Sequence, residues 1–276
     1  MTRPFTENHK LIPMKRLVIA LSIITYLTSC TKTDSNHSIP GGTLADFNAF
    51  MAQPGNGSFS IYSSAIMSSQ DSVRRVSVGG TFSDGGPLPI PGGPVTVGAF
   101  HLPTDFQPHL GYYYDDELRN APSLFGGDIP FDINPNGDGQ ITGNHATIFL
   151  KVPPSIRMTA PALNDTIRAG NGAPLNIIQW VPDTANPKNV LIGCAYYPTD
   201  NPSFSATLSS SIVHTTAVPD SGSYTLRPED LAGFPEGSRI HLSVTRVAYT
   251  AGYSQDGTKK YLVYSRDEVD EQYIFE

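Results

Sequence analysis

Turn-forming residues recur at short intervals along the chain and leave little room for long helices. The 276 residues include 25 glycines and 24 prolines. Proline lacks the backbone N–H that a helix interior needs, and glycine favours turns, so such a chain folds most readily into short strands joined by turns. Between the turns lie runs rich in valine, threonine, tyrosine and phenylalanine, as is typical of strands. The sequence therefore predicts an all-β protein built of antiparallel sheets.

Two groups of strand-like runs flank the dipeptide Pro153-Pro154. Consecutive prolines favour a stiff, extended backbone, which is typical of a junction between domains. We expect one antiparallel β-sandwich domain over residues 44–153 and a second over residues 154–276. A short helix is expected over residues 44–51, because their apolar side chains recur with helical spacing after a capping threonine.

The second group of runs resembles a divergent fibronectin type III domain over residues 154–276. The residues that carry the resemblance are Ile178, Trp180, Pro182, Ser223–Leu226, Ile240, Leu242 and Val244. The resemblance implies an immunoglobulin-like sandwich of about seven strands with a core tryptophan, and it concerns fold rather than activity. The chain departs from the family at residues 227–233, RPEDLAG, in place of a tight turn. Pro228 at a first helical position and Gly233 beyond the end predict one helical turn there.

A short apolar run near the amino terminus follows two basic residues, Lys15 and Arg16. The run, Leu17–Leu27, is shorter than the roughly 20 residues that cross a bilayer and has the length of a signal-peptide core. It ends in Leu27-Thr28-Ser29-Cys30, which resembles the lipobox of bacterial lipoproteins. The pattern therefore predicts export and lipid attachment.

The resemblance to bacterial lipoproteins implies a signal peptide over residues 1–29, with Met14 as the natural start. Cys30 would then be the first mature residue, carrying several acyl chains, palmitate among them, that hold the protein on a membrane. Residues 30–43, small and polar, would form a lipidated tether. Because Thr31 is not the aspartate associated with inner-membrane retention, we expect the outer membrane of the cell envelope. An ordinary secretory signal with a coincidental cysteine is the alternative.

The net charge and the second cysteine argue against nucleic-acid binding and against a reactive thiol. The formal net charge is −7 and no basic stripe is present, so nucleic acid is not an expected partner. With Cys30 lipidated, Cys194 has no partner for a disulfide. It alternates with apolar residues and has no adjacent histidine or lysine, which predicts a buried, unreactive thiol.

The strongest metal candidate is a turn rich in asparagine, aspartate and glycine that resembles the first half of an EF-hand-type Ca²⁺ loop. Its oxygen ligands would be Asp132, Asn134, Asn136 and Asp138. Oxygen atoms at alternate positions of a turning chain wrap a hard cation such as Ca²⁺. His145, however, stands where a bidentate glutamate is expected. A plain hairpin turn explains the same residues without a metal.

The segment LGYYYDDE is the strongest ligand-binding candidate. Tyr112 and Tyr114 alternate on one strand, where their rings could stack on sugar rings while the acidic residues that follow accept hydrogen bonds from hydroxyl groups. The alternative is structural, because tyrosine is a favoured strand residue with a buried ring and a solvated hydroxyl.

The sequence contains no nucleophile elbow, HExxH zinc motif, phosphate-binding loop or dinucleotide-binding motif. We therefore expect a protein without catalytic activity. The leading expected function is a binding or interaction module of the cell envelope, with a glycan or an envelope protein as partner. Two alternatives stay open: a structural envelope scaffold, and a polysaccharide-acting hydrolase, since glycosidase carboxylates follow no general sequence motif.

Overall fold

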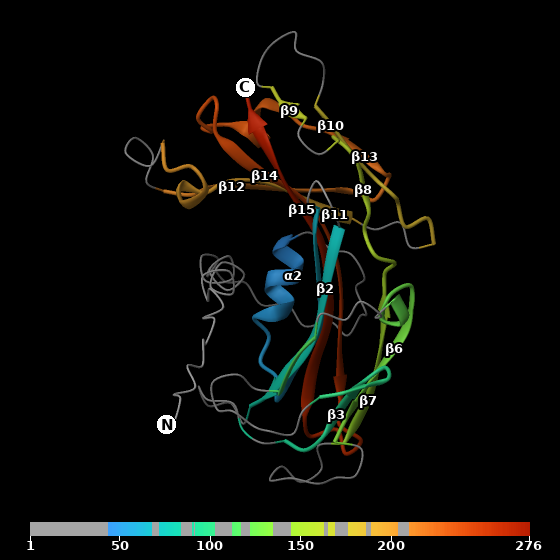
Figure 1. The fold of residues 1–276 in the computed structure, drawn as a ribbon. Coiled ribbons are helices and arrows are strands. Elements are labelled where there is room, and N and C mark those ends of the chain that lie inside the picture. Colours follow the sequence, from blue (N-terminus) through green and yellow to red (C-terminus); the bar gives the residue numbers. More distant parts are fainter. Residues whose placement is uncertain are drawn as a thin grey trace, which may run out of the picture. The chain divides into compact units, whose positions relative to one another are not determined.

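Strands arranged in three sheets dominate the part of the chain that the structure describes (Figure 1). The computed structural model describes residues 44–67, 72–83, 90, 92–102, 112–116, 122–134, 145–162, 165–168, 176–185, 189–203 and 210–276. They belong to one compact unit, His37–Glu276, and a further unit, Met1–Asn36, lies outside the described residues. The expected signal peptide and tether therefore cannot be described. The prediction of an all-β fold is confirmed.

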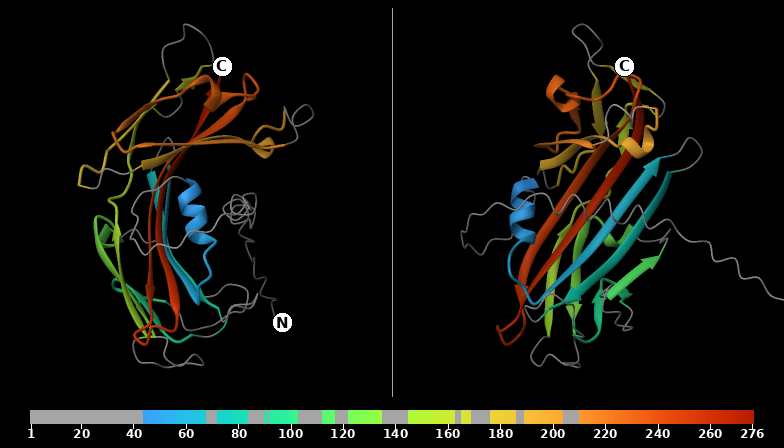
Figure 2. Two further views of the ribbon diagram at one scale, coloured as in Figure 1. Left: turned by 180° about the vertical axis from the view of Figure 1, so that it is seen from behind. Right: turned by 90° about the vertical axis from the view of Figure 1, so that its left-hand side faces the viewer.

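The largest sheet has eight strands among the described residues, with β14 and β15 near its centre. In order across the sheet the strands are β12 (Ile212–Pro219), β11 (Asn189–Tyr196), β14 (Arg239–Tyr253), β15 (Lys260–Phe275), β1 (Gly57–Met67), β2 (Ser72–Phe82) and β5 (Tyr112–Asp116), and the short β9 (Thr166–Ile167) also pairs with β15. Figure 2 shows the long strands side by side. β15 pairs in parallel with β1, where Gly57 lies opposite Tyr261, and antiparallel with β14. The first and last long strands of the chain are therefore neighbours.

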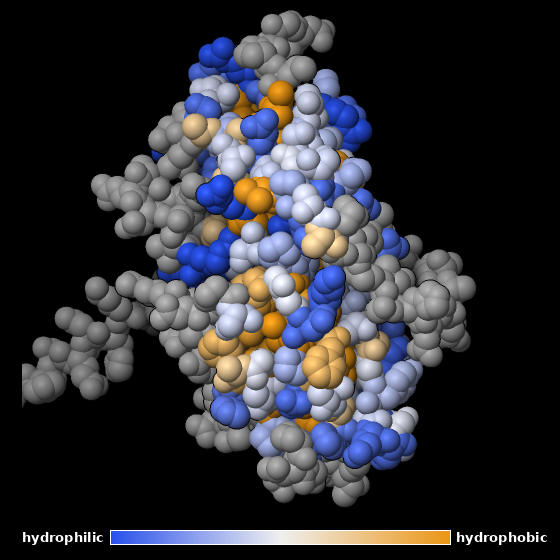
Figure 3. All heavy atoms as spheres, turned by 90° about the vertical axis from the view of Figure 1, so that its right-hand side faces the viewer, coloured by the Kyte–Doolittle hydropathy of each residue, from blue (hydrophilic) through white to orange (hydrophobic). Residues whose placement is uncertain are grey.

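Two smaller sheets pack against one face of the large sheet. One has the order β4 (Phe100–His101), β3 (Val95–Val97), β6 (Gly127–Ile133) and β7 (Ala146–Val152), and the other has the order β13 (Ser223–Thr225), β10 (Ile177–Trp180) and β8 (Met158–Ala160). Buried and exposed residues alternate along β7, as expected for a strand with one face in a core. Figure 3 views the side of β6 and β7 and shows hydrophobic residues in separate places between hydrophilic ones.

Each small sheet encloses its own hydrophobic core against the large sheet. The first core contains Phe59, Val78, Phe131 and Ile133 together with Ala248 and Val263 from the central strands. The second contains Trp180, Ile192, Cys194 and Tyr196 together with Val244 and Val269 from the same strands. The first core draws mainly on residues before the expected boundary at residues 153/154 and the second mainly on residues after it, but β14 and β15 contribute to both. With 16 residues at about 3.3 Å each, β15 spans about 50 Å, which is long enough to line two cores in succession.

A helix covers part of the opposite face of the large sheet. α2 (Leu44–Met51) confirms the expected short helix. The ring centroid of Phe50 lies 4.6 Å from that of Tyr249 on β14, and Phe47 lies 5.6 Å from both Tyr249 and Tyr264. Aromatic side chains thus hold α2 against one end of this face. No helix among the described residues is long and apolar enough to span a membrane.

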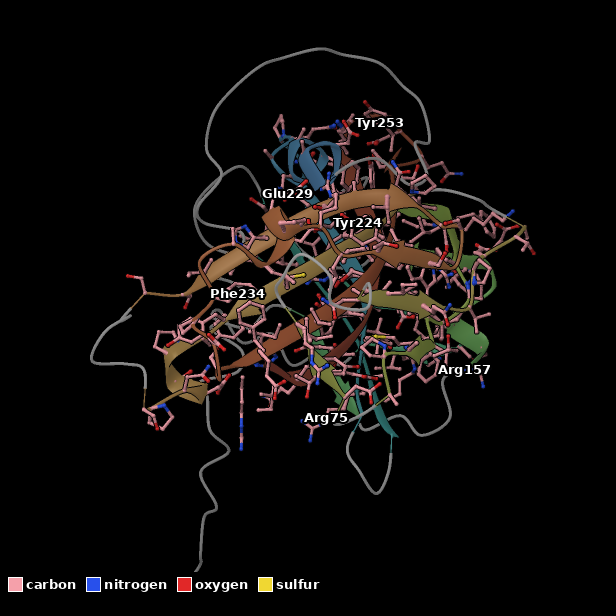
Figure 4. The ribbon with its side chains drawn as sticks, turned by 90° about the horizontal axis from the view of Figure 1, so that it is seen from above. Arg75, Arg157, Tyr224, Glu229, Phe234 and Tyr253 are labelled. Carbon is pink, nitrogen blue, oxygen red and sulfur yellow. The ribbon has the colours of Figure 1, made fainter. Side chains whose placement is uncertain are left out.

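Three single-turn 3₁₀ helices complete the described elements: η1 (Pro122–Leu124), η2 (Pro198–Asp200) and η3 (Pro228–Leu231). η3 confirms the helical turn expected in RPEDLAG, and Gly233 follows it at φ +83. Buried Asp230 accepts hydrogen bonds from the Arg227 backbone N–H at 2.8 Å and from the Tyr224 hydroxyl at 2.7 Å. These bonds hold the turn over the second core, and Figure 4 looks down on this end with Tyr224, Glu229 and Phe234 labelled.

Two arginines, the buried Arg246 and the half-buried Arg74, hold the connection between β7 and β8. Arg246 on β14 forms a two-bond ion pair with Asp220, at 2.7 and 3.1 Å, and donates to the carbonyl of Pro154 at 3.0 Å. Arg74 on β2 pairs with Asp267 on β15 and donates to the carbonyl of Ile156 at 2.6 Å. The two donors bind the backbone at Pro154 and two residues later. The expected junction is therefore bonded to two strands of the large sheet, β14 and β2.

The second core also contains a free cysteine. Cys194 is buried, and burial, followed by the nearby charge of Asp230, raises the pKa of its thiol to about 12. We expect Cys194 not to react with a thiol reagent in the native protein and to react fully after unfolding, because the buried thiol is inaccessible and its reactive thiolate is scarce at neutral pH. A Val213→Cys variant on the exposed part of β12 is the matched control and should react at once. Rapid labelling of native Cys194 would contradict this assignment.

Candidate functional site

One region of the other face of the large sheet, along β1, β14 and β15, carries polar side chains. We call this region the polar face, defined by Tyr62, Ser64, His241, Thr245, Arg266, Glu268, Asp270 and Gln272. The pairing register places them together, with Tyr62 opposite Arg266, Thr245 opposite Glu268 and His241 opposite Gln272. They lie on β1, β14 and β15. Residues at alternate positions of these strands face the hydrophobic cores, so the polar set shares one side of the sheet.

His241 is held between two carboxylates. Its Nδ1 lies 3.0 Å from Asp270 Oδ2 and its Nε2 lies 3.0 Å from Asp200 Oδ2, at the end of η2. The ring of Tyr197 meets the imidazole edge to face at a centroid distance of 5.1 Å. Burial alone would lower the pKa of His241, but the hydrogen bonds and charges of Asp270 and Asp200 outweigh it and raise that pKa. When it is protonated, the imidazole donates from both nitrogens. The Gln272 amide also lies beside the ring, with its Nε2 3.1 Å from His241 Nε2.

An arginine and a glutamate continue the polar face towards β1. Arg266 Nη2 donates to Glu268 Oε2 at 2.9 Å, and the guanidinium lies 5.9 Å from the centroid of the Tyr62 ring. Burial raises the pKa of Glu268, and Asp270 raises it further, whereas Arg266 and the Thr245 hydroxyl oppose the change. Arg266 Nε is buried and has no hydrogen-bond acceptor among the described residues.

This arrangement supports hydrogen bonding better than metal binding or base catalysis. Both nitrogens of His241 already lie within hydrogen-bonding distance of carboxylates, so neither is left for a metal ion or a substrate. Within the described ranges no group of three histidine, cysteine, aspartate or glutamate residues could hold a metal ion. Asp200 and Asp270 are 35 % and 37 % exposed and Gln272 is exposed, so acceptor oxygens and an amide face the solvent.

The structure describes only part of the calcium candidate. Asp132 lies on β6 opposite Thr147, and Asn134 is buried at the left-handed φ of +45, where its N–H donates to the carbonyl of Pro94 at 2.7 Å. Asn136 and Asp138 lie outside the described residues. The Ca²⁺ loop stays a prediction, which a calorimetric titration with Ca²⁺ tests directly.

The remaining candidates are placed in part or not at all. The backbone of Tyr112 pairs with Gly80 and that of Tyr114 with Val78, and the side chains of both tyrosines lie outside the described part. Cys30 also lies outside it. Sugar stacking on the tyrosines and lipidation of Cys30 therefore stay predictions.

The sequence reasoning missed the polar face. Its signal is present in the last strand, where tyrosine, arginine, glutamate, aspartate and glutamine occupy alternate positions from Tyr264 to Gln272. Such alternation indicates a strand with one polar side. It was not enough by itself to place His241 or Asp200, which come from elements distant in the sequence.

No family model, no curated protein and no solved structure matches the chain.

The raised pKa of His241 gives a pH-dependent contribution to stability. Because the pKa is higher in the folded than in the unfolded protein, the contribution is fully present below the ordinary histidine pKa of about 6.5 and is lost as the pH rises through the folded value. We expect His241→Gln to lower the free energy of unfolding most near pH 6 and progressively less towards pH 8.5. NMR titration of the ring protons checks the cause, and a midpoint below 6.5 would contradict it.

Proposed function

We propose that the protein is a non-catalytic binding module of the cell envelope that takes a glycan or an envelope protein on its polar face. The observation that carries the proposal is the placement of charged and amide side chains along the two central strands of the sheet. Charged groups in the middle of a sheet are costly to desolvate, and those that serve stability alone are usually fully paired. Clusters of titratable groups with shifted pKa values are also typical of functional sites.

Photo-crosslinking in cells tests this role. A photoreactive phenylalanine analogue at position 272, on the polar face, should capture an envelope glycan or protein. The same analogue at Gln179, an exposed glutamine on β10, should not capture it. A structural scaffold that only braces its neighbours predicts equal capture at both positions, and capture at neither would contradict a binding role.

We propose further that the module is a lipoprotein of the outer membrane, anchored through Cys30 and a tether over residues 30–43. The proposal is supported by the lipobox and by the short apolar run before it. A Cys30→Ser variant is expected to leave the membrane fraction and to lose labelling by a palmitate analogue. Retention in the membrane fraction would overturn the anchor without affecting the proposed binding site.

We propose that the protein comprises two sandwich domains and that residues 154–276 form the divergent fibronectin type III-like one. Strand order supports this part of the proposal. An immunoglobulin-like domain places its first, second and fifth strands in one sheet and its third and last two strands in the other. The sheets β8-β10-β13 and β11-β14-β15 follow the same order, and Trp180 is buried between them.

A polysaccharide-acting hydrolase is the second candidate. It is favoured by Glu268, whose raised pKa suits a proton donor, beside the carboxylate of Asp270 two residues along the same strand. Measurement of reducing ends released from polysaccharides separates the two functions. A binding module releases none, and release that disappears in Glu268→Gln would establish the hydrolase instead.

A further inference from the structure

The two faces of the large sheet differ in how completely their charged groups are bonded. Towards the cores, Arg246 donates to both oxygens of Asp220 and to the carbonyls of Pro154 and Val181. On the polar face, Arg266 donates to Glu268, and its buried Nε has no acceptor among the described residues. A buried donor without an acceptor is destabilising. The polar face is thus less completely satisfied than the networks that stabilise the fold.

Two carboxylates are the most exposed of its charged groups. His241 and Glu268 are each 16 % exposed and Arg266 is 23 % exposed, whereas Asp200 and Asp270 are exposed to more than twice the extent of His241. His241 separates these two carboxylates, one at each ring nitrogen, and so holds their positions. Each carboxylate keeps lone pairs that its bond to the imidazole does not use. The surface therefore presents two oriented acceptors, and beside them the exposed Gln272 amide, whose Nε2 lies 3.1 Å from His241 Nε2 and whose oxygen is left for a ligand.

The charged groups of the polar face favour one class of ligand over the others. The polar face and its border hold three acidic side chains, Asp200, Glu268 and Asp270, against two basic ones, Arg266 and His241. An anionic ligand would meet the outward carboxylates, and a cationic ligand would compete with the His241 ring that lies between them. Hydroxyl groups avoid both conflicts because each one donates and accepts a hydrogen bond. The half-buried Tyr197 at the border adds an aromatic surface for C–H groups.

We propose that the polar face binds an uncharged, hydroxyl-rich ligand, a neutral oligosaccharide, whose hydroxyl groups donate to Asp200 and Asp270 and pair with the Gln272 amide. This inference rests on the proposed binding function and names the ligand class for the same site.

Affinity electrophoresis of the purified protein through gels with embedded polysaccharide tests the inference. The probes are xyloglucan, glucomannan and β-1,3-glucan as neutral polymers, polygalacturonate as an anion and chitosan as a cation. We expect retardation by at least one neutral polymer and by neither charged one. Gln272→Ala should weaken that binding about tenfold, the effect of one lost hydrogen bond of about 1.4 kcal/mol, and Asp270→Asn should weaken it as well.

Matched variants separate binding from folding. Gln179→Ala removes an exposed glutamine from β10, and Asp128→Asn alters an exposed carboxylate on β6, so both should bind as the unaltered protein does. Trp180 fluorescence melts show whether each variant is folded. If only a charged polymer retards the protein, and Gln272→Ala abolishes that retardation, the proposal of a neutral ligand is wrong but the binding function stands. If no polymer retards the protein and position 272 crosslinks only to a protein, the oligosaccharide proposal is again wrong and the binding function again stands. Failure of both experiments would overturn both proposals.

Discussion

Replacing Asp220 by alanine is expected to lower the free energy of unfolding by about 3–5 kcal/mol, because the change leaves Arg246 as an unpaired charge in the second core. The Asp220 carboxylate accepts two bonds from Arg246 and one, at 2.6 Å, from the Trp180 indole. Both members of the ion pair are buried, so solvent screens the interaction little. Urea unfolding followed by circular dichroism measures the loss independently of the tryptophan signal.

Two variants test the origin of that effect. Asp220→Asn keeps an acceptor for the indole but removes the charge, so it should also be strongly destabilising. Asp128→Ala removes an exposed carboxylate on β6 and should change stability by less than about 1 kcal/mol. If Asp220→Ala were as mild as Asp128→Ala, the buried ion pair would not stabilise the fold.

Phe131→Ala in the first core is expected to shift the unfolding that is observed at Trp180 in the second core. Phe131 is fully buried, and its truncation should cost about 3–5 kcal/mol. Because β14 and β15 line both cores, we expect the two to unfold together. Trp180 is the only tryptophan, so its fluorescence reports the second core alone. Its urea midpoint should therefore fall by the same amount as the midpoint seen by circular dichroism.

The neighbouring strand supplies a matched control for this coupling. Phe149 on β7 is 64 % exposed, and Phe149→Ala should leave the Trp180 midpoint almost unchanged. If Phe131→Ala prevents folding, the milder Phe131→Leu gives a smaller shift in the same direction. A Trp180 midpoint that stays constant while circular dichroism records early loss of the first core would show that the halves unfold independently.

Local features of the fold could be predicted from the sequence. The helix Leu44–Met51 follows from its apolar spacing, and the turn of η3 follows from Pro228 and Gly233, because capping and turn chemistry depend on near neighbours. The all-β character follows from the frequency of glycine and proline among β-branched and aromatic residues. These signals act over a few residues and do not depend on the rest of the chain.

The pairing of distant strands could not be predicted in the same way. Gly57 lies opposite Tyr261, and no local pattern states which strand a given strand will join. The same limit applies to the candidate site, where His241 meets Asp200 from η2 and Asp270 from β15. Alternation on β15 predicts that one side is polar, whereas the partners across it depend on the order of strands in the sheet.

The parallel pairing of β1 with β15 also constrains the order of events during biosynthesis. A chain delivered amino terminus first presents β1 and β2 early, but β1 lacks its second neighbour until the final residues emerge. Until then the first core lacks Tyr261 and Val263, and one edge of β1 stays open to pairing with other chains. Contacts between such distant residues also slow folding. A chain that stops shortly before residue 260 would lack β15. Neither core could then close, and the chain would not fold.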